Sequence, residues 1–167
     1  FNSWLPYAEI GSFTYHFGFH AASALFHWIT GLSVPKSVLY TGQVFNLLAV
    51  FALYPLTMRL TRNRWTALLS LIAAGLLFPL PMAYVNWSRY TQLAGQVILP
   101  AFVCLVWLLF ENLERDKGLI ALAGLTLGGL ALTHYRVVVL ALAFIPAWLL
   151  LNLRQQRLTA QIKKVFW

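Results

Sequence analysis

Long apolar runs separated by short polar clusters dominate the chain. Runs of this kind occupy positions 37–58, 65–81, 93–110, 118–134 and 137–153. A helix needs ~20 predominantly apolar residues to cross a bilayer, and with their flanks these runs approach that length. The pattern therefore predicts an all-α, polytopic integral membrane bundle with five spanning helices. Since no fixed-period repeat or low-complexity linker divides the sequence, we expect positions 1–167 to form a single membrane-embedded unit.

The apolar run at 13–32 differs from the others because it carries three histidines. His16, His20 and His27 are separated by offsets of 4 and 11 residues, which places them within roughly 40° of one another on a helix of 3.6 residues per turn. A polar stripe on one face of an aromatic-rich helix is typical of a helix that lies at the membrane interface. We therefore favour an interfacial helix at 13–32, with a sixth spanning helix as the alternative.

Composition supports a lipid environment and argues against nucleic acid as a partner. Of 167 residues, 60% are hydrophobic and 10% are charged, whereas a soluble domain carries about 25% charged residues. The net charge of +8 is spread over the ends of apolar runs. Such placement is what membrane orientation produces, and it lacks the basic stripe of a nucleic-acid-binding face.

The distribution of Lys and Arg predicts an orientation in the membrane. Only Lys36, Arg89 and Arg136 belong to the links on one side, which include the loop at 82–92 and the link at 133–136. The opposite side, which the positive-inside rule makes cytoplasmic, includes the C-terminal tail. The nine basic residues on this cytoplasmic side are Arg59, Arg62, Arg64, Arg115, Lys117, Arg154, Arg157, Lys163 and Lys164.

Two polar corners on the outer side are the candidate binding site. One contains Arg89 and Gln92, and the other contains His134 and Arg136. Because guanidinium groups bind phosphates through a planar fork of donors, we expect these four residues to converge on one anion-binding pocket. The alternative is that the arginines lie among interfacial aromatics and extend to the headgroups of membrane lipids.

Candidates for acid–base and metal chemistry are few. Glu111, Glu114 and Asp116 fall in a cytoplasmic link, so Glu9 is a weak candidate for a catalytic acid on the outer side. General acid–base catalysis commonly recruits such a carboxylate. No cysteine or carboxylate of suitable spacing joins the histidines of 13–32, so we predict no metal site. Gly124 and Gly128 form a G-x-x-x-G pattern, which predicts close helix packing within the bundle.

Two stretches resemble the C-type (GT-C) superfamily of polytopic glycosyltransferases. Y-H-F-G-F-H-A-A-S-A-L-F-H-W-I-T-G (Tyr15 to Gly31) is similar to the Y-P-P-G-F-H…G segment of that superfamily. W-S-R-Y-T-Q-L-A-G is similar to a W-G-R-Y-x-Q-x-x-G stretch in uncharacterised bacterial and archaeal membrane proteins of this type. The matching positions are Tyr15, His20, Arg89, Tyr90 and Gln92.

The resemblance implies transfer of a sugar from a polyprenyl-phosphate donor at the outer face of a prokaryotic cell membrane. It implies that Arg89 and Arg136 bind the lipid phosphate and that His20 or His134 orients the sugar or the acceptor. The superfamily's catalytic acid lies upstream of these motifs, and the loop at 82–92 lacks the Asp that such proteins often carry there. We therefore expect an N-terminally incomplete piece of a longer protein, and whether it is itself an enzyme stays open.

A second hypothesis assigns no enzymatic activity. The chain would then be a membrane subunit that packs against other subunits of a larger complex, and His16, His20 or His27 would bind haem or chlorophyll. In the transferase hypothesis no cofactor is expected.

Overall fold

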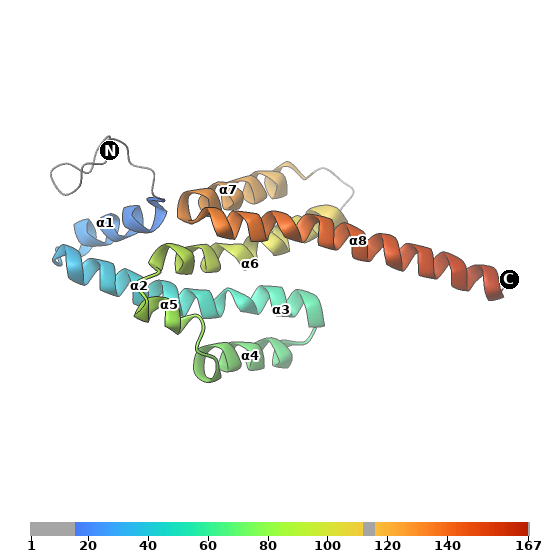
Figure 1. The fold of residues 1–167 in the computed structure, drawn as a ribbon, viewed down its shortest axis with the longest axis horizontal. Coiled ribbons are helices and arrows are strands. Elements are labelled where there is room, and N and C mark those ends of the chain that lie inside the picture. The colour runs from blue at the N-terminus through green and yellow to red at the C-terminus, as the bar shows by residue number, and fades with distance from the viewer. Residues whose placement is uncertain (1–15, 112–115, 167) are drawn as a thin grey trace.

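The computed structural model describes residues 16–111 and 116–166, with side chains described as far as Asn152. Helices form every regular element in these ranges, so the predicted all-α fold is confirmed (Figure 1). Their order is α1 (Gly18–Thr30), α2 (Val34–Phe51), α3 (Leu53–Thr61), α4 (Arg64–Ile72), the π-helical turn η1 (Ala73–Leu77), α5 (Met82–Asn86), α6 (Tyr90–Glu111), α7 (Lys117–Thr133) and α8 (Tyr135–Phe166).

Four described stretches are long and apolar enough to cross a membrane. They are Val34–Thr61, which joins α2 and α3; Arg64–Asn86, which joins α4, η1 and α5; Tyr90–Glu111; and Tyr135–Asn152. The fifth predicted span, α7, is a shorter apolar helix of 17 residues, about 26 Å long at 1.5 Å per residue. The chain is thus a helical membrane protein whose predicted spans match the observed helices to within a few residues at most ends.

Two boundaries differ from the prediction. The apolar run at 65–81 leaves the helix at Phe78, whose backbone is extended, because Pro79 and Pro81 follow and proline cannot continue a helix. The predicted loop at 82–92 is wrong: α5 occupies its first half, and α6 already begins at Tyr90. The last helix runs beyond the predicted span at 137–153 as far as Phe166, which confirms the expectation that the basic tail continues this helix.

Helix α1 is shorter than the predicted element at 13–32. Its 13 residues span about 20 Å, less than the ~30 Å of a bilayer's hydrocarbon core, which favours the predicted interfacial helix over a sixth spanning helix. The expected stripe of three histidines does not form, because His16 precedes the helix. The helix stops at Gly31, whose φ of +68° is the left-handed conformation that glycine readily adopts at a helix C-terminus.

Helix α6 is the centre of the bundle. It lies between α7 and α8 on one side and α2 and α3 on the other, and α4 packs outside α3 (Figure 1). Phe102 and Val106 of α6 are buried against Leu130 of α7 and Val137 of α8. The remaining surface carries many exposed leucines, isoleucines and valines, as expected for helices that face lipid.

The glycine pattern on α7 does not pack as predicted. A Cβ atom added at Gly124 or Gly128 would meet nothing within 4 Å in the described structure, so this face of α7 is open. The close helix contacts occur at other glycines: Gly42 of α2 lies against Tyr90, and Gly95 of α6 lies against Val137.

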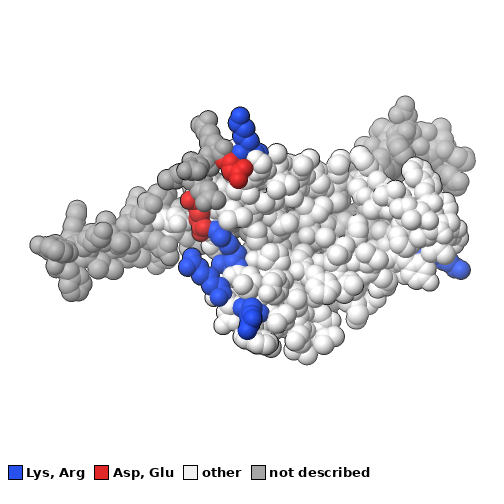
Figure 2. Space-filling model, turned by 180° about the vertical axis from the view of Figure 1, so that it is seen from behind, with Lys and Arg blue, Asp and Glu red and all other residues white. Residues whose placement is uncertain are grey.

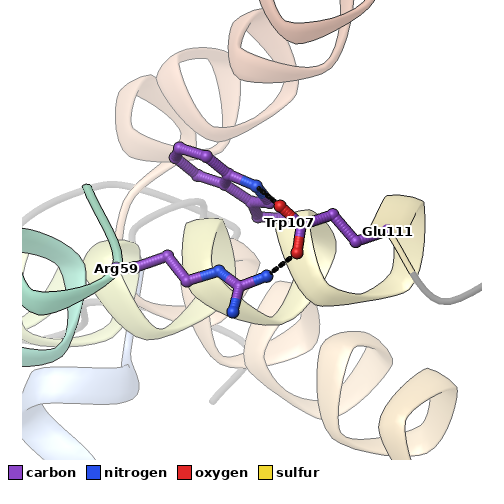
Figure 3. A network of polar contacts seen from close by, with 3 residues as sticks. All are labelled: Arg59, Trp107 and Glu111. Atoms are coloured by element: carbon purple, nitrogen blue, oxygen red, sulfur yellow. Dashed lines mark hydrogen bonds and ion pairs between the residues drawn. The ribbon is translucent and has the colours of Figure 1, made fainter. Parts of the chain in front are cut away.

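Charged side chains gather at one end of the bundle, where α3 turns into α4 and α6 leads to α7 (Figure 2). At this end Arg59 of α3 forms an ion pair with Glu111 of α6. The indole Nε1 of Trp107 donates a hydrogen bond of 2.6 Å to the other carboxylate oxygen of Glu111 (Figure 3). The Arg59 guanidinium also lies 5.8 Å from the centroid of the Trp107 ring. These contacts join α3 to α6.

Candidate functional site

The two polar corners lie together because α6 and α8 begin at the same end of the bundle. Gly95, near the start of α6, lies against Val137, near the start of α8; a Cβ atom at Gly95 would come within 2.7 Å of a Val137 methyl group. The absence of a side chain at Gly95 thus lets the two helix starts approach closely. The first N–H groups of a helix have no partner inside it, and both helices direct these groups toward one end.

A cavity of about 240 Å³ lies between the two helix starts. Of the residues predicted for the site, Arg89 and Gln92 line it from α6 and the turn before it, while His134 and Arg136 line it from the α7–α8 corner. The structure therefore places all four around one cavity. The complete lining is Ser88, Arg89, Thr91, Gln92, His134, Tyr135 and Arg136.

Local contacts hold Arg89 at the rim. The turn after α5 passes through Ser88 with φ of +54°, and the Arg89 backbone N–H then donates to the Tyr84 carbonyl at 2.8 Å. The guanidinium carbon of Arg89 lies 5.4 Å from the centroid of the Trp87 ring, within the range of a cation–π contact. The side chain of this cavity-lining residue is thereby held against an aromatic neighbour.

Arg136, which also lines the cavity, is held in a similar way. Its Nε donates to the Tyr135 hydroxyl at 3.2 Å, and its backbone N–H donates to Nδ1 of His134, also at 3.2 Å. A guanidinium carries five N–H donors, so the bond to Tyr135 leaves most of the fork for other acceptors. Two positive groups and two helix starts, each bearing partial positive charge, thus surround one small space.

His134 is the histidine that lines the cavity. Burial lowers the pKa of its imidazole below 6.5, and the nearby His16 and Arg136 lower that pKa further. The His134 and His16 rings are 5.2 Å apart. Nε2 of His16 accepts a hydrogen bond of 3.4 Å from the Tyr135 backbone N–H, so the segment that precedes α1 reaches the start of α8.

Gln92 brings an unsatisfied acceptor to the site. Its Oε1 atom is buried and has no hydrogen-bond partner in the part of the chain that the structure describes. Leaving a buried carbonyl oxygen without a donor costs free energy of folding. Thr91, beside it, is buried as well.

Two of the predicted site residues, Tyr90 and His20, lie away from the cavity. The Tyr90 ring stacks on Phe19 with centroids 5.0 Å apart and covers Gly42, so Tyr90 packs α1 and α2 onto α6 and does not line this cavity. His20 of α1 is exposed beside Phe19 and does not line it either. Tyr15 and Glu9 lie outside the described residues.

Sequence reasoning missed Ser88, Thr91, Tyr135 and His16 as neighbours of the site. Ser88 and Tyr135 directly precede the two arginines, and this adjacency is the signal that would have included them. Thr91 follows from helix geometry once α6 is known to begin at Tyr90. For His16 the sequence holds no such signal, because its contact with Tyr135 joins positions 119 residues apart.

Carboxylates of the described ranges lie away from the cavity. Glu111 ends α6, and Asp116 caps the start of α7 by accepting from the Gly118 and Leu119 N–H groups at 2.8 and 3.2 Å. Both therefore belong to the opposite end of the bundle. Within residues 16–111 and 116–152, no group of three or more His, Cys, Asp or Glu side chains is placed to hold a metal ion.

Comparison with protein families gives one match, which spans residues 2–166 and therefore nearly the whole chain. The matched family is described as a family of unknown function, DUF6541. The chain belongs to the DUF6541 family. No curated protein matches this DUF6541 chain, and no solved structure matches it.

Proposed function

We propose that this DUF6541 chain is part of a membrane glycosyltransferase and that its cavity binds the phosphate of a polyprenyl-phosphate sugar. The observation that carries the proposal is the presence of both Arg89 and Arg136 in the lining of one cavity, between the starts of α6 and α8. The resemblance of the Tyr15–Gly31 and Trp87–Gly95 stretches to GT-C transferases supports the choice of ligand.

The electrostatics of the cavity favour an anion. Arginine forks and helix N-termini are each recurrent partners of phosphate groups, and the described carboxylates are at the other end of the bundle. The low pKa of His134 keeps its imidazole neutral near pH 7, so it can donate or accept a hydrogen bond without adding charge. A phosphodiester would then be bound chiefly by the two arginines.

The size of the cavity favours a headgroup. Its volume of about 240 Å³ corresponds to about eight water molecules at ~30 Å³ each, and it is smaller than a pocket for a drug-sized ligand, ~300–1,000 Å³. In the proposal the phosphate and part of one sugar occupy this space. The prenyl chain lies outside, along the apolar surface of the bundle.

The chemical step requires a group that activates the acceptor. A carboxylate commonly serves as the general base in such a step. In this proposal it comes from Glu9 or from sequence outside this chain. The role of the described residues is to bind the phosphate, to orient the sugar and to stabilise the negative charge that develops on the leaving phosphate as the sugar is transferred.

Binding of a short prenyl donor tests the proposal. The protein is reconstituted in phosphatidylcholine nanodiscs and titrated with a farnesyl phosphoryl hexose. Because a hydrogen bond to a charged group contributes about 1.5–3 kcal/mol, Arg89→Gln and Arg136→Gln should each weaken binding by about tenfold to a hundredfold. Arg64→Gln is the matched control, since Arg64 begins α4 at the opposite end of the bundle, and it should bind like the wild type.

The same titration distinguishes this site from arginines that hold ordinary headgroups. Farnesol, which lacks the phosphate, should bind much more weakly than the phosphoryl hexose. Equal binding of farnesol, or full affinity in Arg89→Gln and Arg136→Gln, contradicts the proposal. Equal competition by phosphatidylglycerol also contradicts it, because the arginines would then bind lipid phosphates without regard to the sugar.

A further inference from the structure

The start of helix α1 contacts both walls of the cavity that lies between the starts of α6 and α8. Helix α1 packs on α6 and α7 as well as on α2, and its first turn lies beside the corner where α7 leads into α8 (Figure 1). The contacts are made by His16, Gly18 and Phe19. Because these residues fall within four consecutive positions, the segment at 16–19 joins two parts of the bundle that are far apart in sequence.

Gly18 lets this segment approach the end of α7. A Cβ atom at Gly18 would lie 2.9 Å from the carbonyl oxygen of Leu132 and 3.1 Å from the methyl group of Thr133. The first of these atoms is backbone, and Thr133 is buried with its hydroxyl donating to the Leu130 carbonyl at 2.9 Å. A side chain at position 18 would therefore push α1 away from the corner that carries Arg136.

His16 adds a polar contact with the same corner. Its Nε2 atom accepts from the Tyr135 backbone N–H at 3.4 Å, and this N–H, the first of α8, has no partner inside the helix. The centroid of the His16 ring lies 5.2 Å from that of His134 and 5.4 Å from that of Tyr135. His134 and Tyr135 both line the cavity, so His16 contacts one of its walls directly.

Phe19 contacts the other wall. Its side chain is 1% exposed, and its ring stacks on the Tyr90 ring with centroids 5.0 Å apart and an angle of 12° between the planes. Phe45 of α2 packs edge-on against Phe19 at 5.7 Å. Because Tyr90 begins α6 and directly follows Arg89, the stack fixes the start of α6 relative to α1.

We propose that the segment at 16–19 is a positioning element that sets the separation of Arg89 and Arg136. The two helix starts touch at Gly95 and Val137, and a single contact leaves the angle between two helices free to change. The segment supplies a second connection, through residues that precede this contact in both helices. Hydrogen bonds between a guanidinium and a phosphate are confined to about 2.7–2.9 Å, so displacing one arginine would weaken the binding of a shared phosphate.

Substitution of Gly18 tests the effect on binding, which rests on the function proposed above. In the farnesyl phosphoryl hexose titration, Gly18→Leu should weaken binding by about tenfold, the loss expected when one hydrogen bond to a charged group is misaligned. Gly18→Ala adds one methyl group and should give a smaller loss. Gly124→Leu and Gly124→Ala are the matched controls and should bind like the wild type, since a Cβ atom at Gly124 meets nothing within 4 Å in the described structure.

The titration of His134 tests the positioning role without any ligand. Burial lowers the pKa of the His134 imidazole, and the nearby His16 and Arg136 lower it further. If α1 moves away from the corner, both the burial and the influence of His16 decrease. The pKa of His134 should therefore rise toward its ordinary value in Gly18→Leu and Gly18→Ala. Nuclear magnetic resonance of histidine-labelled protein measures this pKa, and the variant His134→Gln identifies the signal.

The two measurements separate the positioning role from the proposed function. A wild type that does not bind the donor overturns the glycosyltransferase proposal, while a raised pKa of His134 in the Gly18 variants still supports the positioning role. An unchanged pKa of His134 in both Gly18 variants overturns that role. So does wild-type affinity for the donor in both of them. Gly18→Ala supplies the answer if the larger side chain of Gly18→Leu prevents folding.

Discussion

Arg89 and Arg136 each follow an aromatic residue by one or two positions and lie against its ring. The guanidinium of Arg89 is 5.4 Å from the Trp87 centroid, and that of Arg136 is 5.8 Å from the Tyr135 centroid. Cation–π contacts at exposed sites contribute about 0.5–1 kcal/mol, which reduces the freedom of two long side chains before a ligand arrives. Each arginine is therefore partly positioned by its own stretch of sequence.

The titration of His134 predicts how anion binding depends on pH. Burial, His16 and Arg136 lower the pKa of this imidazole below 6.5, whereas a bound phosphodiester would favour the protonated form and raise it. By linkage, affinity should then increase as pH falls through the pKa of the complex. For a shift of about half to one pKa unit, the gain should be about threefold to tenfold. The measurement is the farnesyl phosphoryl hexose titration repeated between about pH 8 and pH 5.

The variant His134→Gln provides the comparison, since glutamine does not titrate. Its affinity should stay nearly level over the same pH range, and the phosphodiester itself keeps one negative charge throughout. An unchanged pH profile in His134→Gln would assign the effect to another group. Without ligand the sign is opposite: protonation is less favourable in the folded protein, so the free energy of unfolding should fall as pH drops below about 6.5.

At the residue scale, the sequence predicted the composition of the site better than its packing. Polar residues in an apolar chain stand out, so Arg89, Gln92, His134 and Arg136 could be found from position alone. Tyr90 belongs to the same motif, yet its ring packs on Phe19. The sequence did not show where α6 begins, and without that boundary the direction of the Tyr90 side chain could not be derived.

At the scale of elements, the packing of α2 on α6 depends on the absence of a side chain at Gly42. A Cβ atom there would lie 2.4 Å from Cε1 of Tyr90, which is far inside contact distance. The Tyr90 ring is also stacked on Phe19 of α1, and Phe19 is 1% exposed. The ring therefore has little room to yield, and three helices meet at this one position.

Gly42→Ala should therefore destabilise the fold. Overpacking in a filled interior costs typically about 1–3 kcal/mol, which exceeds the roughly 1 kcal/mol that alanine gains over glycine in a helix. At about 2–4 °C per kcal/mol for a chain of this length, the Tm should fall by several degrees. Intrinsic tryptophan fluorescence during heating in detergent measures this change.

Gly124→Ala is the control for helix propensity. It introduces the same methyl group into α7, where a Cβ atom meets nothing within 4 Å in the described structure. Its Tm should be equal to that of the wild type or slightly higher. If Gly42→Ala behaved in the same way, the close contact between α2 and the Tyr90 ring would not contribute to stability.

Helix boundaries could be predicted where capping residues mark them. Asn63 accepts from the Trp65 and Thr66 N–H groups at the start of α4, and Asp116 does the same for α7. Both are preferred N-cap residues, and the predicted starts of these spans were close to the observed ones. Helix α6 follows Arg89, which is not a preferred cap, so the sequence places its first turn in the predicted loop at 82–92.

For the whole molecule, the separation of charge between the two ends predicts orientation. Lys36, Arg89 and Arg136 belong to the end of the bundle with the cavity between α6 and α8. The group of Arg59, Arg62 and Arg64 belongs to the other end. By the positive-inside rule the second group should face the cytoplasm. In a Cys104→Ser background, an impermeant thiol reagent added to intact cells should label Lys36→Cys and should not label Arg64→Cys.

Both positions are exposed, so lack of access within the fold would not explain a difference between them. Permeabilised cells should give labelling of both variants, which controls for reactivity. Labelling of Arg64→Cys alone in intact cells would reverse the orientation. The cavity would then face the cytoplasm, where a donor at the outer face could not reach it.

Helix α8 runs from the cavity at the starts of α6 and α8 to the far end of the molecule. Its 32 residues extend for about 48 Å, which exceeds the ~30 Å hydrocarbon thickness of a bilayer. Since Pro146 is the interior position where the backbone ladder is weakened, a tilt imposed on the tail can be absorbed there and nowhere else as readily. Bending at Pro146 would then leave the first turns of α8, which carry Arg136, little affected by what the last turns bind.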